Sequence, residues 1–302
     1  MEGLHIGNND TFIEQFVQQT SNLSLIARGD GTEIMIQNIQ KNNYFFVEPG
    51  ESKELMEFFY ILEGEISFTV NEEEKKLLKN DYFYVHELNE TIKFKAEVDV
   101  KLLYVTTKPV FHYISSTLRE LNQISKKSQE KDMYTHNHGD RVQRYSIEIA
   151  NRLNLSSDMV ERIAFGSLFH DIGKINIPDE ILKKPSSLTN EEFDEIKKHP
   201  EYGAKLVEKT YFKDLSKVIN QHHEKVDGSG YPNGLKGDEI CLEARIISIA
   251  DSYDAMTSDR PYRKGMTESQ ALSEIKKYAG SHYDSELVEI FADILYKKEG
   301  IK

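Results

Sequence analysis

The stretch that decides the fold is residues 170–179, HDIGKINIPD. It follows an apolar segment, Met159 to Leu168, whose spacing of three and four residues predicts an amphipathic helix. The His170-Asp171 pair at the end of that helix offers an imidazole and a carboxylate side by side, and both are metal ligands. A single His-Asp dipeptide is common in structural roles, so the rest of the chain decides whether this one binds a metal.

Imidazole and carboxylate side chains recur near the ends of other predicted helices. Each alone is more often an ordinary core or surface residue than a ligand. Together they lack sulfur, which suits iron, manganese, nickel or zinc rather than calcium or magnesium. They also outnumber the ligands of one tetrahedral ion, so two metals with a bridging carboxylate are the economical arrangement. The candidate ligands are His138, His170, Asp171, His199, His222, His223 and Asp251.

Composition excludes several classes of protein. The chain has 302 residues, a net charge of −13 and one cysteine, so a disulfide framework is excluded and a reducing cytoplasmic setting is expected. No secretory signal and no apolar run of about 18 residues is present, so no membrane span is expected. The negative balance argues against long nucleic acids, whose binding needs Lys and Arg against phosphates. A small anionic substrate remains compatible with it.

Before Pro109, short runs rich in β-branched and aromatic residues predict strands and hence a small antiparallel sandwich or barrel. A helix is expected ahead of them, around residues 11–27. Turns are expected at Glu63-Gly64, as a hairpin, and at residues 71–74. The predicted strands are residues 33–36, 44–47, 58–62, 66–70, 82–85, 92–96 and 100–105.

After Pro109 the apolar period becomes helical. A stripe at intervals of three and four residues predicts a helix of about 20 residues, and this stripe either packs against its own domains or forms a homodimer. Capping boxes are expected at Asp158, Thr189 and Thr267. The predicted domains are residues 1–108, a linking helix at 109–130, and an all-α domain at 131–302. The stripe comprises Phe111, Ile114, Leu118, Leu121 and Ile124.

Several linked motifs over residues 131–295 resemble the HD-GYP family of cyclic-dinucleotide phosphodiesterases. They are HDIGK at 170–174, HHE at 222–224, DGSGYP at 227–232, DSYDAMT at 251–257 and RPYR at 260–263. The resemblance implies a helical HD bundle that hydrolyses cyclic di-GMP to linear pGpG or on to GMP. The residues leave two alternatives open: a phosphohydrolase for another cyclic dinucleotide or nucleotide, or a signalling adaptor that binds without turnover.

The resemblance also implies roles for the candidate ligands. His138, His170, Asp171 and Asp251 would surround one metal, and Asp171 would bridge to a second metal held by His199, His222 and His223. Two divalent ions, iron or manganese, would acidify a bridging water for in-line attack on phosphorus. Lys174 would stabilise developing charge or assist the leaving group, the alternative being a solvated surface lysine.

Substrate contacts are expected from the two later motifs. Tyr231, in the loop at 227–232, would stack on or hydrogen-bond to the cyclic dinucleotide, or else anchor its own loop. Arg260 and Arg263 suit the second phosphate by charge-assisted bonding. Family members with a third metal carry a glutamate four residues before the first ligand histidine. Tyr134 stands there in this chain, which predicts two metals rather than three.

The strands at residues 33–105 resemble a cupin, through residues 57–65 and 80–85. Metal-binding cupins place two histidines ahead of the shared glutamate, where this chain has Glu51 and Lys53, and a third near Thr91 is absent. A metal enzyme is therefore not expected in this half. A small-molecule sensor and a dimerisation module both remain open.

Overall fold

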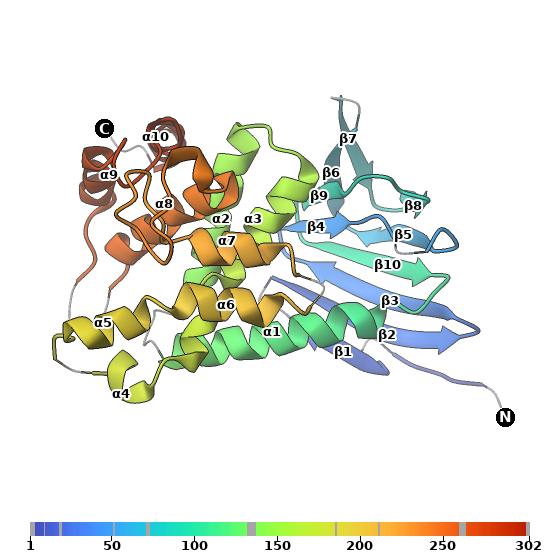
Figure 1. The fold of residues 1–302 in the computed structure, drawn as a ribbon. Coiled ribbons are helices and arrows are strands. Elements are labelled where there is room, and N and C mark those ends of the chain that lie inside the picture. The colour runs from blue at the N-terminus through green and yellow to red at the C-terminus, as the bar shows by residue number, and fades with distance from the viewer. Residues whose placement is uncertain are drawn as a thin grey trace. The chain divides into compact units, whose positions relative to one another are not determined.

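The computed structural model describes residues 4–299 apart from 9, 18–19, 51, 71–72, 132–136, 185, 211 and 260–263, and it leaves out the side chains of 112–119 and 298–299. The chain divides into two compact units, Met1–Arg119 and Glu120–Lys302. Figure 1 shows strands in the first unit and helices in the second. The predicted linking helix at 109–130 is thus shared between the two units, with the division at Arg119.

The first unit is built from two antiparallel sheets. One has the order β1-β2-β3-β10-β5-β8 and the other has the order β4-β9-β6-β7. This confirms the predicted antiparallel architecture. The strands are β1 (Glu14–Val17), β2 (Ser21–Gly29), β3 (Thr32–Ile39), β4 (Tyr44–Val47), β5 (Met56–Glu63), β6 (Glu65–Val70), β7 (Glu73–Leu78), β8 (Tyr82–His86), β9 (Ile92–Ala96) and β10 (Val100–Thr106).

Stacked aromatic rings connect the two sheets. Alternate side chains of β5 and β10 are buried, as the two-residue period of a strand with one inner face requires. The Phe59 ring stacks on Tyr104 at 4.3 Å and on Phe83 at 4.6 Å between ring centroids. Phe83 in turn stacks at 4.5 Å on Phe94, which belongs to the other sheet. Offset-stacked pairs like these stabilise a core beyond the area they bury.

The helix expected around residues 11–27 is wrong, because that segment forms β1 and β2. Leu23 and Leu25 are buried two residues apart, and Leu25 pairs with Met35 of β3. Helix propensity is low at Ser21, Asn22 and Ser24, since their side chains hydrogen-bond to nearby backbone groups in non-helical conformations. Pairing with β3 over eight residue pairs therefore decides the local structure.

Two predicted turns also need correction. The strands on either side of Glu63-Gly64 do not form a hairpin: β5 pairs with β10 and β8, whereas β6 pairs with β7 and β9. The chain crosses here from one sheet to the other, and a Cβ at Gly64 would lie 2.5 Å from the Asp99 carbonyl oxygen. Of the turn expected at 71–74, Glu73 and Glu74 belong to β7, and residues 71–72 lie outside the described part.

The second unit is helical, as predicted. None of the described helices has the length and hydropathy of a membrane span. Its elements are the C-terminal part of α1 (Phe111–Lys131), then α2 (His138–Arg152), α3 (Ser157–Phe169), the 3₁₀ turn η1 (Ile172–Asn176), α4 (Asp179–Leu182), α5 (Asn190–Ile196), α6 (His199–Val207), α7 (Leu215–Gln221), η2 (Gly237–Glu239), α8 (Leu242–Thr257), α9 (Glu268–Lys277) and α10 (Ser285–Glu299).

Helix starts follow local chemistry. The capping boxes at Thr189 and Thr267 are confirmed. The one expected at Asp158 is wrong, because Ser156 caps α3 and its hydroxyl accepts from the Met159 N–H. Of the apolar stripe on α1, Phe111 and Leu121 are buried and Ile124 is partly buried, while the side chains of 112–119 lie outside the description.

Candidate metal centre

The candidate ligands lie at helix ends, with one exception in the middle of a helix. His138 and His199 are the first residues of α2 and α6, and His170 and His222 directly follow α3 and α7. Asp251 is the exception, within the buried face of α8. His199 therefore begins a helix, whereas the sequence placed it at the end of the preceding one. Side chains at helix ends can converge from several directions without sharing one helix face.

Three of the imidazoles have their ring orientation fixed by backbone carbonyls. Nδ1 of His170 donates to the Ser167 carbonyl at 2.7 Å, and Nδ1 of His222 donates to Ile219 at 2.7 Å. His199 donates to Ile196 at 2.8 Å. Each carbonyl belongs to the last turn of an α-helix, where carbonyls have no intrahelical partner. A carbonyl accepts only, so Nδ1 carries the proton and the neutral ring presents an unprotonated Nε2.

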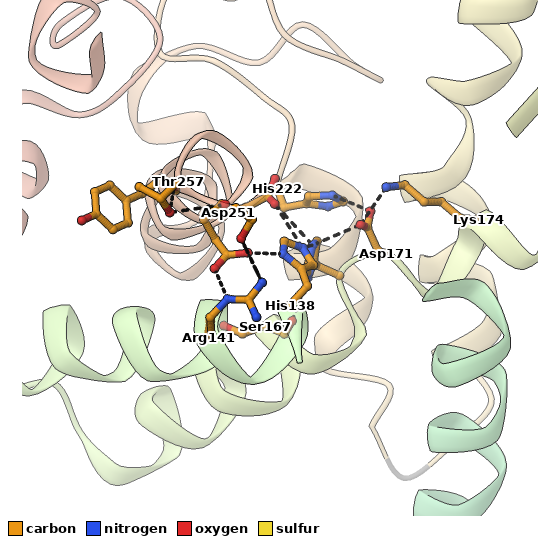
Figure 2. Close-up of polar contacts among 12 residues, drawn as sticks. His138, Arg141, Ser167, Asp171, Lys174, His222, Asp251 and Thr257 are labelled. Carbon is orange, nitrogen blue, oxygen red and sulfur yellow. Dashed lines mark hydrogen bonds and ion pairs between the residues drawn. The ribbon is translucent and has the colours of Figure 1, made fainter. Parts of the chain in front are cut away.

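These Nε2 atoms form part of two neighbouring groups. His138, His170 and Asp251 form one group, whose ligand atoms all lie within 4.8 Å of one another. The His138 and His170 Nε2 atoms are 3.3 Å apart, and His138 Nε2 is 3.3 Å from Asp251 Oδ1. Figure 2 shows His138 and Asp251 directed toward one another.

The second group, also within 4.8 Å, contains Asp171, His199, His222 and His223. His199 Nε2 lies 3.2 Å from Asp171 Oδ1 and 3.3 Å from His222 Nε2. The other oxygen of Asp171, Oδ2, lies 3.4 Å from His170 Nε2 of the first group. The two oxygens of Asp171 thus face different groups, which is the placement a bridging carboxylate requires.

Two carboxylate oxygens lack hydrogen bonds. Oδ1 of Asp171 and Oδ1 of Asp251 are buried, and neither has a hydrogen-bond partner among the described residues. A buried anionic oxygen without a partner is costly. In the second group, the unprotonated Nε2 atoms of His199 and His222, 3.3 Å apart, also repel each other unless a cation lies between them. Nitrogen lone pairs and orphaned carboxylate oxygens together fit divalent cations, so the residues present could hold a metal in each group.

Electrostatics within the cluster is strongly coupled. Burial alone would raise the pKa of Asp171, but Lys174 and His170 outweigh it and hold that pKa well below its usual range. Burial would lower the pKa of His138, yet the neighbouring carboxylates of Asp251 and Asp254 raise that pKa to about 9. Burial and His199 lower the pKa of His223 to about 3. Positive charge is thus attracted to the carboxylates, while His223 stays neutral and free to ligate.

Lys174 is part of this cluster and is not a surface lysine. The residue is 6% exposed, and Nζ donates to Asp171 Oδ2 at 2.7 Å. Figure 2 shows it beside Asp171, at the opposite end of the cluster from Arg141. The ammonium is therefore placed where it can act on an anion bound at the centre.

Tyr231 lies against the second group. Its ring centroid is 4.9 Å from that of His223 and 6.4 Å from that of His199. The loop that carries it folds around Glu224, which is 2% exposed and accepts from the backbone N–H groups of Asn233 (2.7 Å) and Leu235 (3.0 Å). A buried carboxylate with two backbone donors fixes the loop and hence the tyrosine ring.

The structure brings all seven predicted ligands together and places the predicted Lys174 and Tyr231 beside them. Arg260 and Arg263, expected at the second phosphate, lie outside the described residues, and so does Tyr134, the position behind the prediction of two metals. No role was predicted for Asp254 or Glu224. Glu224 belongs to the HHE motif at 222–224 and Asp254 to the DSYDAMT motif at 251–257. A charged residue within an apolar helix was the sequence feature that could have indicated a buried role for Asp254.

Comparisons with known proteins agree with this geometry. Residues 116–287 match the HD domain family model. A cyclic di-GMP phosphodiesterase of Thermotoga maritima is 41% identical over 182 residues, covering 59% of this chain and 49% of that protein. A 3′3′-cGAMP-specific phosphodiesterase of Vibrio cholerae is 35% identical over 175 residues, covering 57% and 33%. The chain spans about half the length of the first relative and a third of the second.

For the first unit, a cupin superfamily protein from Desulfitobacterium hafniense covers 31% of this chain and 82% of its own. The identity is 17% and the TM-score is 0.26.

Proposed function

Because the chain belongs to the HD domain family and carries the HD-GYP motifs, we propose that its helical unit is a metal-dependent phosphodiesterase that hydrolyses cyclic di-GMP. The observation that carries the proposal is the pair of adjoining groups with unprotonated Nε2 atoms and orphaned Oδ1 atoms. Bound cations would satisfy these buried lone pairs, whose burial is otherwise costly.

We assign one divalent ion to each group, iron or manganese, with Asp171 between them. His138, His170 and Asp251 would hold the first ion, and His199, His222 and His223 the second. When bound, such ions supply an acidified water and neutralise the phosphodiester oxygens.

The protein's own residues then have distinct tasks. Hydrolysis forms a bond from the water oxygen to phosphorus and breaks the bond from phosphorus to a ribose oxygen, which gains a proton. Lys174, buried at Asp171 Oδ2, would stabilise the negative charge that develops or donate toward the leaving oxygen. Tyr231 would stack on or hydrogen-bond to the nucleotide. Arg260 and Arg263 are assigned to the second phosphate on sequence alone.

The test is product analysis with metal content measured in parallel. The full chain, purified anaerobically, is loaded with Fe(II) or Mn(II) and given cyclic di-GMP or 3′3′-cGAMP. We expect linear pGpG or GMP from cyclic di-GMP. Faster turnover of 3′3′-cGAMP would assign the other substrate. Tight binding of both nucleotides without product, across metals, would show a signalling adaptor instead.

A matched pair of variants tests the mechanism. Asp171→Asn removes the charge between the groups and should abolish turnover. Asp194→Asn changes an exposed aspartate of α5, paired with Lys197, and should leave turnover unchanged. Undiminished turnover in folded, fully metallated Asp171→Asn protein would contradict the assignment.

For the first unit we propose a regulatory or assembly role. It could sense a small molecule or mediate a homodimer through the 109–130 helix. Light scattering on the full chain, with and without Leu118→Glu, tests the dimer: a monomeric variant from a dimeric parent is the expected result.

A further inference from the structure

His138 differs from the other three tied imidazoles in what fixes its ring. Like His199 it begins its helix, where the unpaired backbone groups are N–H donors, but His199 closely follows α5 and uses the Ile196 carbonyl in the last turn of that helix. Those donors cannot accept a proton from Nδ1. Asp254 of α8 fills this place instead, with its Oδ2 2.7 Å from His138 Nδ1. Among the four, His138 is therefore the one whose orientation depends on another residue's side chain.

Asp254 is itself held firmly. It is 1% exposed, and Arg141 reaches it with Nε at 2.5 Å from Oδ1 and Nη2 at 3.0 Å from Oδ2. The same Nη2 donates to Ser258 Oγ at 3.0 Å. This two-point grip sets the plane of the carboxylate. Arg141 follows His138 by three residues on α2, so these two partners of Asp254 come from one helix turn, and the Ser258 hydroxyl donates to Oδ2 at 3.4 Å.

We infer that Asp254, oriented by Arg141, is a positioning residue that aims Nε2 of His138 into the first group and sets the metal affinity of that group alone. This rests on the metal centre proposed above. A carboxylate that accepts from Nδ1 keeps the proton off Nε2 and makes the ring a stronger ligand. In the second group, His199 and His222 are tied to backbone carbonyls, which a substitution at 254 leaves in place.

The consequence is asymmetric. Asp254→Asn removes the charge, and its amide can turn either its oxygen or its NH₂ toward His138. We expect about 10–100-fold weaker binding at the first group, the usual cost of losing such a partner. Arg141→Lys keeps the positive charge but loses the two-point grip, so it should shift the same affinity in the same direction by less. Binding at the second group should stay as it is.

The experiment titrates Mn(II) into metal-free full-length protein and follows free Mn(II) by electron paramagnetic resonance. Cobalt(II) absorption reports the ligand set independently of activity. The control is Glu243→Gln, which removes another buried carboxylate of α8 from a single arginine, Arg162, at 3.0 Å. We expect one weakened and one unchanged site in Asp254→Asn, and two unchanged sites in Glu243→Gln.

The possible results separate cleanly. Two unchanged affinities in folded Asp254→Asn protein would overturn the inference, and so would equal weakening of both sites. If Asp254→Asn does not fold, Arg141→Lys decides by the same criterion. Wild-type protein that binds two ions but hydrolyses no cyclic dinucleotide would refute the proposed function. The Mn(II) affinities of Asp254→Asn protein would then still support or overturn this inference. Wild-type protein that binds no metal would overturn both.

Discussion

The Lys174 ammonium lies 2.7 Å from Oδ2 of Asp171, and both side chains are buried. The two residues are three apart in the chain, and the 3₁₀ turn η1 that starts between them has three residues per turn, which brings such side chains to the same side. A buried ion pair contributes little net stability, since desolvation offsets much of the attraction. A role in the reaction therefore accounts better for this pair.

Lys174→Met should therefore lower turnover of cyclic di-GMP by about 10²–10³-fold, the usual cost of losing one donor to transition-state charge. Metal content should change little, because Lys174 is not a ligand. Lys183→Met, which removes an exposed lysine paired with Asp179, serves as the control. Wild-type rates in Lys174→Met protein would show that the lysine only balances the charge of Asp171.

Glu224→Gln should raise KM for the nucleotide more than it lowers kcat. The amide cannot accept from both the Asn233 and Leu235 N–H groups, so the loop and the Tyr231 ring lose their anchor. The loss of unfolding free energy should be about 1–3 kcal/mol. Steady-state kinetics and urea unfolding measure the two effects.

A double-mutant cycle shows whether Glu224 acts through Tyr231. In a Tyr231→Ala background, Glu224→Gln should have no further effect on KM. The matched control is Glu239→Gln, an exposed glutamate that accepts from the Lys236 N–H at 2.8 Å in the same region. Additive effects on KM would mean that Glu224 only stabilises the fold.

Gly173→Ala should be destabilising by about 1–3 kcal/mol or more, as overpacking usually is. A Cβ at Gly173 would lie 2.0 Å from the His199 carbonyl oxygen and 2.4 Å from the Gly203 N, so η1 and α6 would have to separate. Thermal unfolding measures the loss. Gly29→Ala is the control, since a Cβ there meets nothing within 4 Å. Equal melting temperatures for the two variants would contradict the close approach.

Glu57 should make the first unit less stable as pH rises. Burial raises the pKa of Glu57 above 4.5, against the opposing hydrogen bond from Tyr104. A carboxyl whose pKa is raised on folding contributes its stability below the unfolded pKa and loses it as pH rises through the folded pKa. Urea unfolding from pH 4 to 7 should therefore show Glu57→Gln gaining stability relative to wild type.

The control for this pH dependence carries the opposite sign. Lys108 lowers the pKa of the exposed Glu54. The free energy of unfolding of Glu54→Gln should therefore fall relative to that of wild type as pH rises. A stability difference between wild type and Glu57→Gln that does not vary with pH would contradict the raised pKa.

Much of the fold followed from local pattern. Seven strands were predicted from short runs rich in β-branched and aromatic residues, and the helices from their period and caps, because these signals reside in neighbouring residues. The failures share a cause. The helix expected at 11–27 was replaced by strands because β2 pairs with β3 and β1 pairs with β2, and after β5 the chain crossed to the other sheet instead of turning back. Strand pairing involves distant residues, so no local window contains it.

The sequence by itself determined which residues could form the centre, because imidazole and carboxylate chemistry belongs to the residue types and their motifs. Only the tertiary structure decided how they are used. It brought a carboxylate from α8 to His138, left two Asp Oδ1 atoms without hydrogen bonds, and buried Lys174. Those facts depend on contacts between residues as many as 116 positions apart, which packing alone creates.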